Sequence, residues 1–216
     1  MACSGLCEAC LASKTPSATG TCDDIDADTD PDMECIGATL CDGAGVCELL
    51  SNGTSCSQNG ECMSNFCVDG VCCNNACPGA CEACNLGGSI GTCTDRAAGA
   101  AGSPSCAPYL CDGNNGTCPN TCVDSGDCSA GNYCNASNNC VAQQANGSMC
   151  GDPEECTSGN CVDGFCCNSA CGGVCQACDG DMTAGAAGTC SFINSGADPE
   201  NECPGPQTCD GAGACM

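Results

Sequence analysis

The sequence predicts a small disulfide-rich fold: an elongated tandem repeat of cysteine-stapled modules with short β-hairpins and long irregular loops. Three observations lead to this class. The 216 residues include 35 cysteines, so that cross-links replace a large apolar core. Aromatic residues are scarce, with three phenylalanines, two tyrosines and no tryptophan. The cysteine spacing also recurs along the chain, which is typical of tandem modules.

The clearest repeat is an 18-residue stretch found at 67–84 and again at 161–178. The two copies agree at 13 of 18 positions, and their six cysteines are in register. They belong to two twelve-cysteine units, at 56–118 and 150–215. The seven cysteines at the start of the chain, from Ala2-Cys3 onward, match only the last seven of such a unit.

This spacing predicts the domain organisation. Each full repeat has a hairpin knot followed by a second part, which in the first full repeat are 56–73 and 77–118. The predicted segments are a partial repeat at 1–49, a full repeat at 50–120, an inserted four-cysteine hairpin at 121–145 and a second full repeat at 146–216.

Local signals predict the structure inside a repeat. Asp-Gly at 69–70 and at 163–164 stands between apolar residues and cysteines, which is a strong signal for a tight β-hairpin. The second part opens with Cys-x3-Cys-x2-Cys, carries a long loop and closes on Cys-Asp-Gly. Only short β-strands are expected there.

Pairs of adjacent cysteines mark the junction between the two parts of a repeat. Neighbouring cysteines cannot bond to each other without a strained ring, and in extended backbone they point to opposite sides. The simplest pairing in the first knot joins Cys56 to Cys67 and Cys62 to Cys72, which directs Cys73 into the second part. Its partner is left open, because twelve cysteines allow many connectivities. The junction cysteines are Cys72, Cys73, Cys166 and Cys167.

The partial repeat at the start has an odd number of cysteines and no knot before it. Three interpretations follow: the chain begins inside a longer repeat array, one thiol is free, or a disulfide joins neighbouring subunits. Under the last interpretation the partners are copies of the chain itself, joined head to tail.

The charge is strongly acidic, with 27 acidic residues against Lys14 and Arg96 and a net charge of −25. Such a surface cannot neutralise phosphates, so neither nucleic acid nor an anionic membrane is expected as a partner. No apolar run has transmembrane length, and membrane insertion is not expected. Disulfides at this density form in an oxidising environment, which predicts an extracellular or cell-surface location.

An acidic run at 23–32 is a candidate calcium site. Carboxylates at every second residue can converge on a hard cation that takes six to eight oxygens. The run resembles the Asp-rich segments of thrombospondin type 3 repeats, although it lacks the glycine of their sharp turn. A solvated variable loop is the alternative. The candidate ligands are Asp24, Asp26, Asp28, Asp30 and Asp32.

Catalytic chemistry has little support in the residue types. Three Cys-x-x-Cys pairs, at 7–10, 81–84 and 175–178, have no βαβ pattern around them, so structural disulfides are favoured over redox or zinc sites. The chain has no histidine, which excludes histidine–cysteine zinc sites and histidine general bases. The protein is expected not to be an enzyme and to need no cofactor, with calcium as the one candidate ion.

Four Asn-x-Ser/Thr sequons lie in polar segments where glycans could be attached. The acceptor asparagines are Asn52, Asn115, Asn135 and Asn146.

The core Val-Asp-Gly-x-Cys-Cys-x3-Cys-x3-Cys-x2-Cys, with the following Gly-Thr-Cys and Cys-Asp-Gly, resembles large secreted bacterial cysteine-rich repeat proteins. This resemblance implies a surface or matrix component. The four-cysteine knots also resemble dickkopf and disintegrin hairpins, but no Arg-Gly-Asp is present. We therefore expect a structural extracellular protein, forming a fibre, filament, sheath or surface stalk. The alternative is an adhesin or ligand-binding ectodomain whose variable loops contact surface glycans or proteins.

Overall fold

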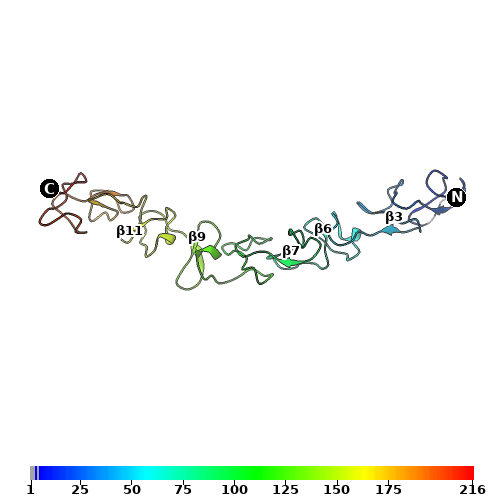
Figure 1. Ribbon diagram of the computed structural model, residues 1–216, viewed down its shortest axis with the longest axis horizontal. Coiled ribbons are helices and arrows are strands. Elements are labelled where there is room, and N and C mark those ends of the chain that lie inside the picture. Colours follow the sequence, from blue (N-terminus) through cyan, green and yellow to red (C-terminus); the bar gives the residue numbers. More distant parts are fainter. Residues whose placement is uncertain (1–2, 4) are drawn as a thin grey trace. The chain divides into compact units, whose positions relative to one another are not determined.

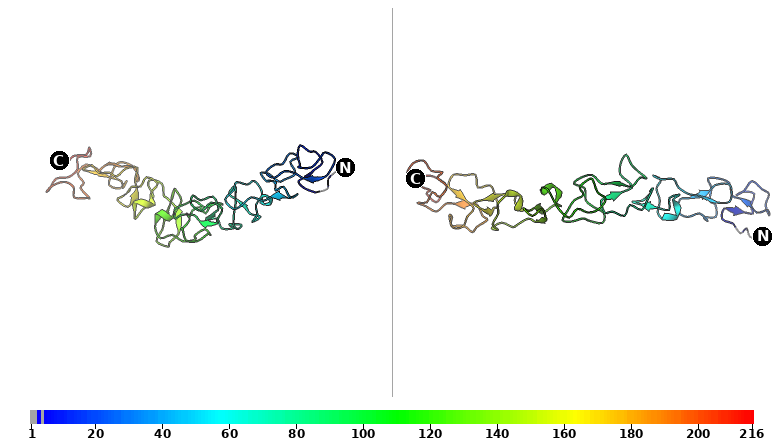
Figure 2. Two further views of the ribbon diagram at one scale, coloured as in Figure 1. Left: turned by 45° about the vertical axis from the view of Figure 1, so that its right-hand side comes forward. Right: turned by 90° about the horizontal axis from the view of Figure 1, so that it is seen from below.

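A computed structural model describes residue 3 and residues 5–216; Met1, Ala2 and Ser4, which belong to the expected partial repeat, lie outside the described residues. The chain divides into two compact units, one formed by Met1–Cys106 and Cys111–Cys118 and the other by Ala107–Leu110 and Pro119–Met216. Within each unit, very short strands alternate with turns and irregular loops (Figure 1, Figure 2). In the described part of the chain, no helical segment has the length and apolar character needed to span a lipid bilayer.

The first unit has four two-stranded antiparallel sheets among its described residues. A 3-10 turn, η1 (Asn59–Glu61), precedes the second cysteine of its knot. The strand pairs are β1 (Glu8–Ala9) with β2 (Asp23–Asp24), β3 (Leu40–Cys41) with β4 (Cys47–Glu48), β5 (Cys67–Val68) with β6 (Val71–Cys72), and β7 (Glu82–Ala83) with β8 (Thr94–Asp95).

The second unit has the same kinds of elements. Its 3-10 turns are η2 (Ser125–Asp127) and η3 (Pro153–Glu155). Its antiparallel pairs are β9 (Asn132–Cys134) with β10 (Cys140–Ala142), β11 (Cys161–Val162) with β12 (Phe165–Cys166), and β13 (Gln176–Ala177) with β14 (Ser191–Phe192). The disulfide-rich class with short β-hairpins and irregular loops is confirmed.

The two Asp-Gly turns form the tight hairpins predicted for them. In the first, Asp69 and Gly70 have φ of 53° and 79°, and the turn pairs Val68 with Val71. Asp163 and Gly164 repeat these angles. Positive φ at both central residues is the type I′ geometry, whose twist matches that of the flanking strands and which aspartate and glycine tolerate best.

Seventeen disulfides cross-link the described part of the chain. Each knot joins its first cysteine to its third and its second to its fourth. The knot bonds are Cys56–Cys67, Cys62–Cys72, Cys122–Cys134, Cys128–Cys140, Cys150–Cys161 and Cys156–Cys166. The pairing expected for the first knot from its spacing is therefore confirmed.

The second parts share a pairing pattern of their own. Four bonds form in the first full repeat: Cys73–Cys84, Cys77–Cys93, Cys81–Cys111 and Cys106–Cys118. The last repeat has the same four: Cys167–Cys178, Cys171–Cys190, Cys175–Cys209 and Cys203–Cys215. The bonds of the opening repeat follow the last three of these positions: Cys3–Cys22, Cys7–Cys41 and Cys35–Cys47.

Sulfur and a few small apolar side chains form the cores. Ile25 is fully buried among the disulfide sulfurs of the opening repeat, and Ile193 takes the same place in the last repeat. The first full repeat has Arg96 at this position, and its Nε donates to the carbonyl of Glu82 over 3.2 Å. The core of that repeat consists mainly of cysteines, with Ala80 packed against them.

Candidate functional site in the joints between modules

The junction between a knot and its second part is fixed by two interactions. Cys73 forms its disulfide with Cys84, which lies in the second part of the repeat as predicted. The carboxylate of Asp69, in the hairpin turn, also accepts a hydrogen bond from the backbone N–H of Cys84 over 2.9 Å. In the last repeat Asp163 accepts from Cys178 over 2.6 Å. The turn aspartate therefore stabilises the junction as well as the hairpin.

A close backbone approach reinforces the same junction. Gly91 has φ of 85°, and a Cβ on it would lie 2.3 Å from the backbone nitrogen of Gly53, just before the knot's first cysteine. Gly188 has φ of 86°, and its Cβ would lie 2.1 Å from the nitrogen of Gly147. Only glycine allows this approach at this φ.

Consecutive modules are connected by a third feature, which we call the backbone joint. A residue that precedes the knot donates its N–H to the carbonyl of the acidic residue before the knot's second cysteine. The residue after that cysteine donates back to a carbonyl of the same preceding segment. The bonds are Leu50 to Glu61 (2.7 Å) with Met63 to Leu50 (3.0 Å), Leu110 to Asp127 (2.8 Å) with Ser129 to Pro108 (2.8 Å), and Gln144 to Glu155 (2.6 Å) with Thr157 to Gln144 (2.9 Å).

Two of the opening acidic residues act as structural caps. Asp30 accepts hydrogen bonds from the backbone N–H groups of Glu34 (2.9 Å) and Cys35 (3.2 Å). The carboxylate of Glu34 accepts from the N–H of Cys7 over 3.2 Å. These bonds tie the acidic loop to the start of the module.

The last repeat builds the same cap. Asp198 accepts from Glu202 (2.9 Å) and Cys203 (3.2 Å), and Glu202 accepts from Cys175 (2.5 Å). The shared signal is Asp-Pro-x-x-Glu-Cys at 30–35 and 198–203. The recurrence of this motif in the last repeat is the sequence signal for the cap, and the charge pattern of the run at 23–32 does not reveal it.

The five candidate calcium ligands have different surroundings. Asp24 lies on β2, Asp26 and Asp28 are exposed, Asp30 is the cap described above, and Asp32 forms an ion pair with Lys14. Protein groups therefore engage the carboxylates of Asp30 and Asp32. Calcium binding by this loop stays a prediction.

The carboxyl group of Glu200, in the last repeat, is a weaker acid than usual. Its pKa is raised to about 7, chiefly because its carboxyl shares a hydrogen bond with Asp163, and further by burial and by the negative charges of Asp163, Glu202 and Asp198. The first full repeat has Ser103 at the position equivalent to Glu200, so no carboxyl group stands there to pair with the Asp69 turn.

Three other aspartates have lowered pKa values. Asp42, Asp112 and Asp210 belong to the closing Cys-Asp-Gly motifs, and their carboxylates accept backbone N–H bonds two residues further along the chain, from Ala44, Asn114 and Ala212. Bonds to the ionised form favour that form, which lowers the pKa.

The Cys-x-x-Cys pairs serve the framework. Cys81 bonds to Cys111 and Cys84 bonds to Cys73, so the two members of the pair hold different parts of the repeat. Cys175 and Cys178 are divided in the same way.

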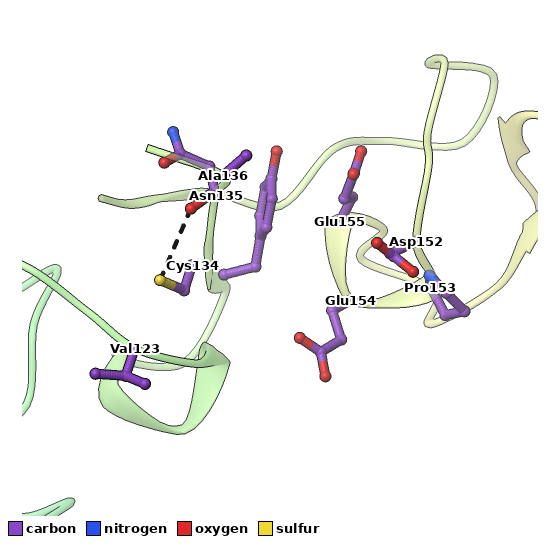
Figure 3. A pocket seen from close by; sticks show the side chains of 9 residues that line it. Val123, Cys134, Asn135, Ala136, Asp152, Pro153, Glu154 and Glu155 are labelled. Atoms are coloured by element: carbon purple, nitrogen blue, oxygen red, sulfur yellow. Dashed lines mark hydrogen bonds between the residues drawn. The ribbon is translucent and has the colours of Figure 1, made fainter. Parts of the chain in front are cut away.

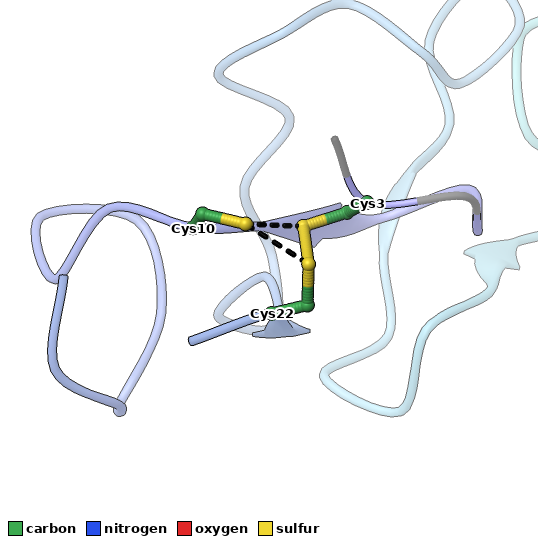
Figure 4. Close-up of side chains that lie close together, drawn as sticks. All are labelled: Cys3, Cys10 and Cys22. Atoms are coloured by element: carbon green, nitrogen blue, oxygen red, sulfur yellow. Dashed lines mark hydrogen bonds between the residues drawn. A yellow bond between two sulfur atoms is a disulfide. The ribbon is translucent and has the colours of Figure 1, made fainter. Parts of the chain in front are cut away.

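In the opening repeat the sulfurs of Cys3, Cys10 and Cys22 lie together (Figure 4). The Cys10 sulfur is 2.6 Å from that of Cys3 and 2.9 Å from that of Cys22. By cysteine order, Cys10 holds the place of Cys84, which bonds to the preceding knot. The disulfide between subunits stays a prediction.

The four sequon asparagines lie outside the strands. Asn52, Asn115 and Asn146 are exposed and Asn135 is half-buried. The side-chain oxygen of Asn135 accepts from the N–H groups of Ser137 and Asn139, both over 3.0 Å, so this asparagine also orders its turn. Glycosylation at these positions stays a prediction.

These features define a class: a protein of tandem disulfide-stapled modules with repeated joints. No protein-family model, curated protein or solved structure matches the chain.

Proposed function

We propose that the protein is a structural component of the extracellular space, in which the repeats form a segment of a fibre, filament, sheath or surface stalk. The observation that carries this proposal is the backbone joint, which recurs at Leu50, Leu110 and Gln144. A protein built to transmit force or maintain spacing needs each module fixed to the next, whereas a flexible linker would allow independent motion.

The disulfide framework supports the same role. Seventeen disulfides need an oxidising environment to form, and they resist the loss of structure outside the cell. The net charge of −25 keeps such a surface hydrated.

Electron microscopy of the purified, oxidised protein tests the proposal. We expect end-to-end filaments or regular assemblies that disperse when the disulfides are reduced. Gel mobility with and without reductant then shows whether disulfides join the subunits. A monodisperse monomer at all concentrations would contradict the assembly role.

A second candidate function, an adhesin or ligand-binding ectodomain, is favoured by one observation. The second unit contains a pocket of about 830 Å³ at the joint between the inserted knot and the last repeat (Figure 3).

A further inference from the structure

The pocket lies where two knots of the second unit meet. One wall is β9 and the turn after it, with Tyr133 and Asn135. The other is η3 and the residue before it, with Asp152, Glu154 and Glu155. Figure 3 shows these three carboxylates on one segment, with Asn135 and Ala136 on the other. At about 830 Å³ the pocket is large enough for a long side chain and part of a peptide backbone.

Hydrogen bonds between the two knots hold the walls in place. The Ser125 hydroxyl, at the start of η2, donates to the carboxylate of Glu154. The side chain of Gln143 donates to the backbone carbonyl of Glu154 over 3.0 Å, and that of Gln144 to the carboxylate of Glu155 over 3.3 Å. The pocket is therefore preformed, which lowers the entropic cost of binding a ligand.

The charge of the pocket is uncompensated. None of its lining residues is basic, and the basic residues of the chain, Lys14 and Arg96, both belong to the other compact unit. The Asp152 carboxylate caps no backbone N–H of η3. A ligand that brings positive charge therefore gains an interaction that the second unit cannot supply to itself.

The lining combines carboxylates with an aromatic ring. A guanidinium group is planar, so it can stack on a tyrosine ring while its N–H groups pair with a carboxylate. An ammonium group can make the charge interaction but not the flat stack. We propose that this pocket binds an arginine side chain of a basic peptide segment in a partner protein.

This proposal is independent of the structural role, because a fibre segment and a monomeric ectodomain could both carry such a pocket. Failure of peptide binding would leave the filament experiment unaffected, and the two results can be told apart.

The test is fluorescence anisotropy with the full chain at about 0.15 M salt, where weak surface charge effects are largely screened. The probe is a labelled Gly-Ser peptide with three arginines, compared with the same peptide carrying lysines. We expect the arginine peptide to bind more tightly than the lysine peptide. Equal binding of the two would contradict the arginine assignment.

Two variants each remove one of the groups proposed to contact the arginine side chain. Asp152→Asn and Tyr133→Leu should each weaken binding of the arginine peptide about tenfold, as expected for losing a charge-assisted hydrogen bond or a stacked ring. Tyr133→Phe should retain most of the affinity, because it keeps the ring.

Asp181→Asn is the matched control, because Asp181 is exposed in the same unit, does not line the pocket, and loses the same charge. Its affinity should equal that of the parent. Equal losses in Asp181→Asn and Asp152→Asn would show binding to the general acidic surface and overturn the proposal. Thiol labelling without reductant checks that each variant keeps its disulfides.

Discussion

Replacing Gly188 by alanine should destabilise the last repeat strongly. The residue has φ of 86°, and a Cβ would lie 2.1 Å from the nitrogen of Gly147 and 2.6 Å from the carbonyl carbon of Asn146. Those atoms are backbone, so they cannot move aside as a flexible side chain would. The substitution would also disturb two bonds of the contact, from Gly147 to Cys166 and from Asn168 to Gly188.

The magnitude has two parts. An alanine in the left-handed region costs about 1–2 kcal/mol. Forcing an added carbon into packed surroundings costs a further 1–3 kcal/mol, roughly. Together, Gly188→Ala should lower the free energy of unfolding by about 2–5 kcal/mol.

Urea unfolding of the oxidised protein measures this difference, and amide hydrogen exchange localises it to the amides of Gly147 and Asn168. Gly172→Ala is the matched control, because a Cβ there meets nothing within 4 Å. It should change stability by less than about 0.5 kcal/mol. If both variants are equally stable, the close backbone contact between Gly188 and Gly147 does not exist in the protein.

Two further predictions concern carboxylates. Asp30→Ala leaves the N–H groups of Glu34 and Cys35 without their acceptor and should lower the free energy of unfolding by about 1–2 kcal/mol. Asp26→Ala, at an exposed position, is the control and should be nearly neutral. Equal effects of the two variants in urea unfolding would contradict the capping role of Asp30. The pKa of Glu200 is raised from 4.5 to about 7 in the folded state, so between these values the folded state binds a proton on Glu200 that the unfolded state lacks. The stability contributed by this proton is present below about pH 4.5 and is lost as the pH rises to about 7. Glu200→Gln should flatten the dependence of the urea midpoint over this window, and an unchanged slope would show that Glu200 does not share its proton with Asp163.

The sequence predicts the knots because their determinants are local. Asp-Gly at 69–70 and 163–164 specifies the turn, and the spacing around it leaves one simple pairing for the four cysteines. That pairing leaves Cys73 unused in the knot and predicts that its bond enters the second part. Its partner, Cys84, could not be chosen, because several cysteines lie within reach of a flexible chain.

Other features depend on how modules pack, and local spacing does not encode them. The charge pattern around Asp30 predicts a calcium ligand. The recurrence of Asp-Pro-x-x-Glu-Cys at 198–203 indicates instead that Asp30 caps backbone N–H groups. The pocket at Tyr133 is different. Its two walls come from separate knots, and side-chain hydrogen bonds from Gln143 and Gln144 to Glu154 and Glu155 help hold them together.

The backbone joint has a consequence for how such chains can change. Its bonds use main-chain atoms alone, and the residues that donate across it are Leu50, Leu110 and Gln144, which share no side-chain chemistry. The inserted knot at 121–145 has a joint at each end. A gene segment that encodes one knot can therefore be duplicated or spliced into the array with the main-chain bonds of the joint retained, because those bonds do not depend on the side chains of the neighbouring modules.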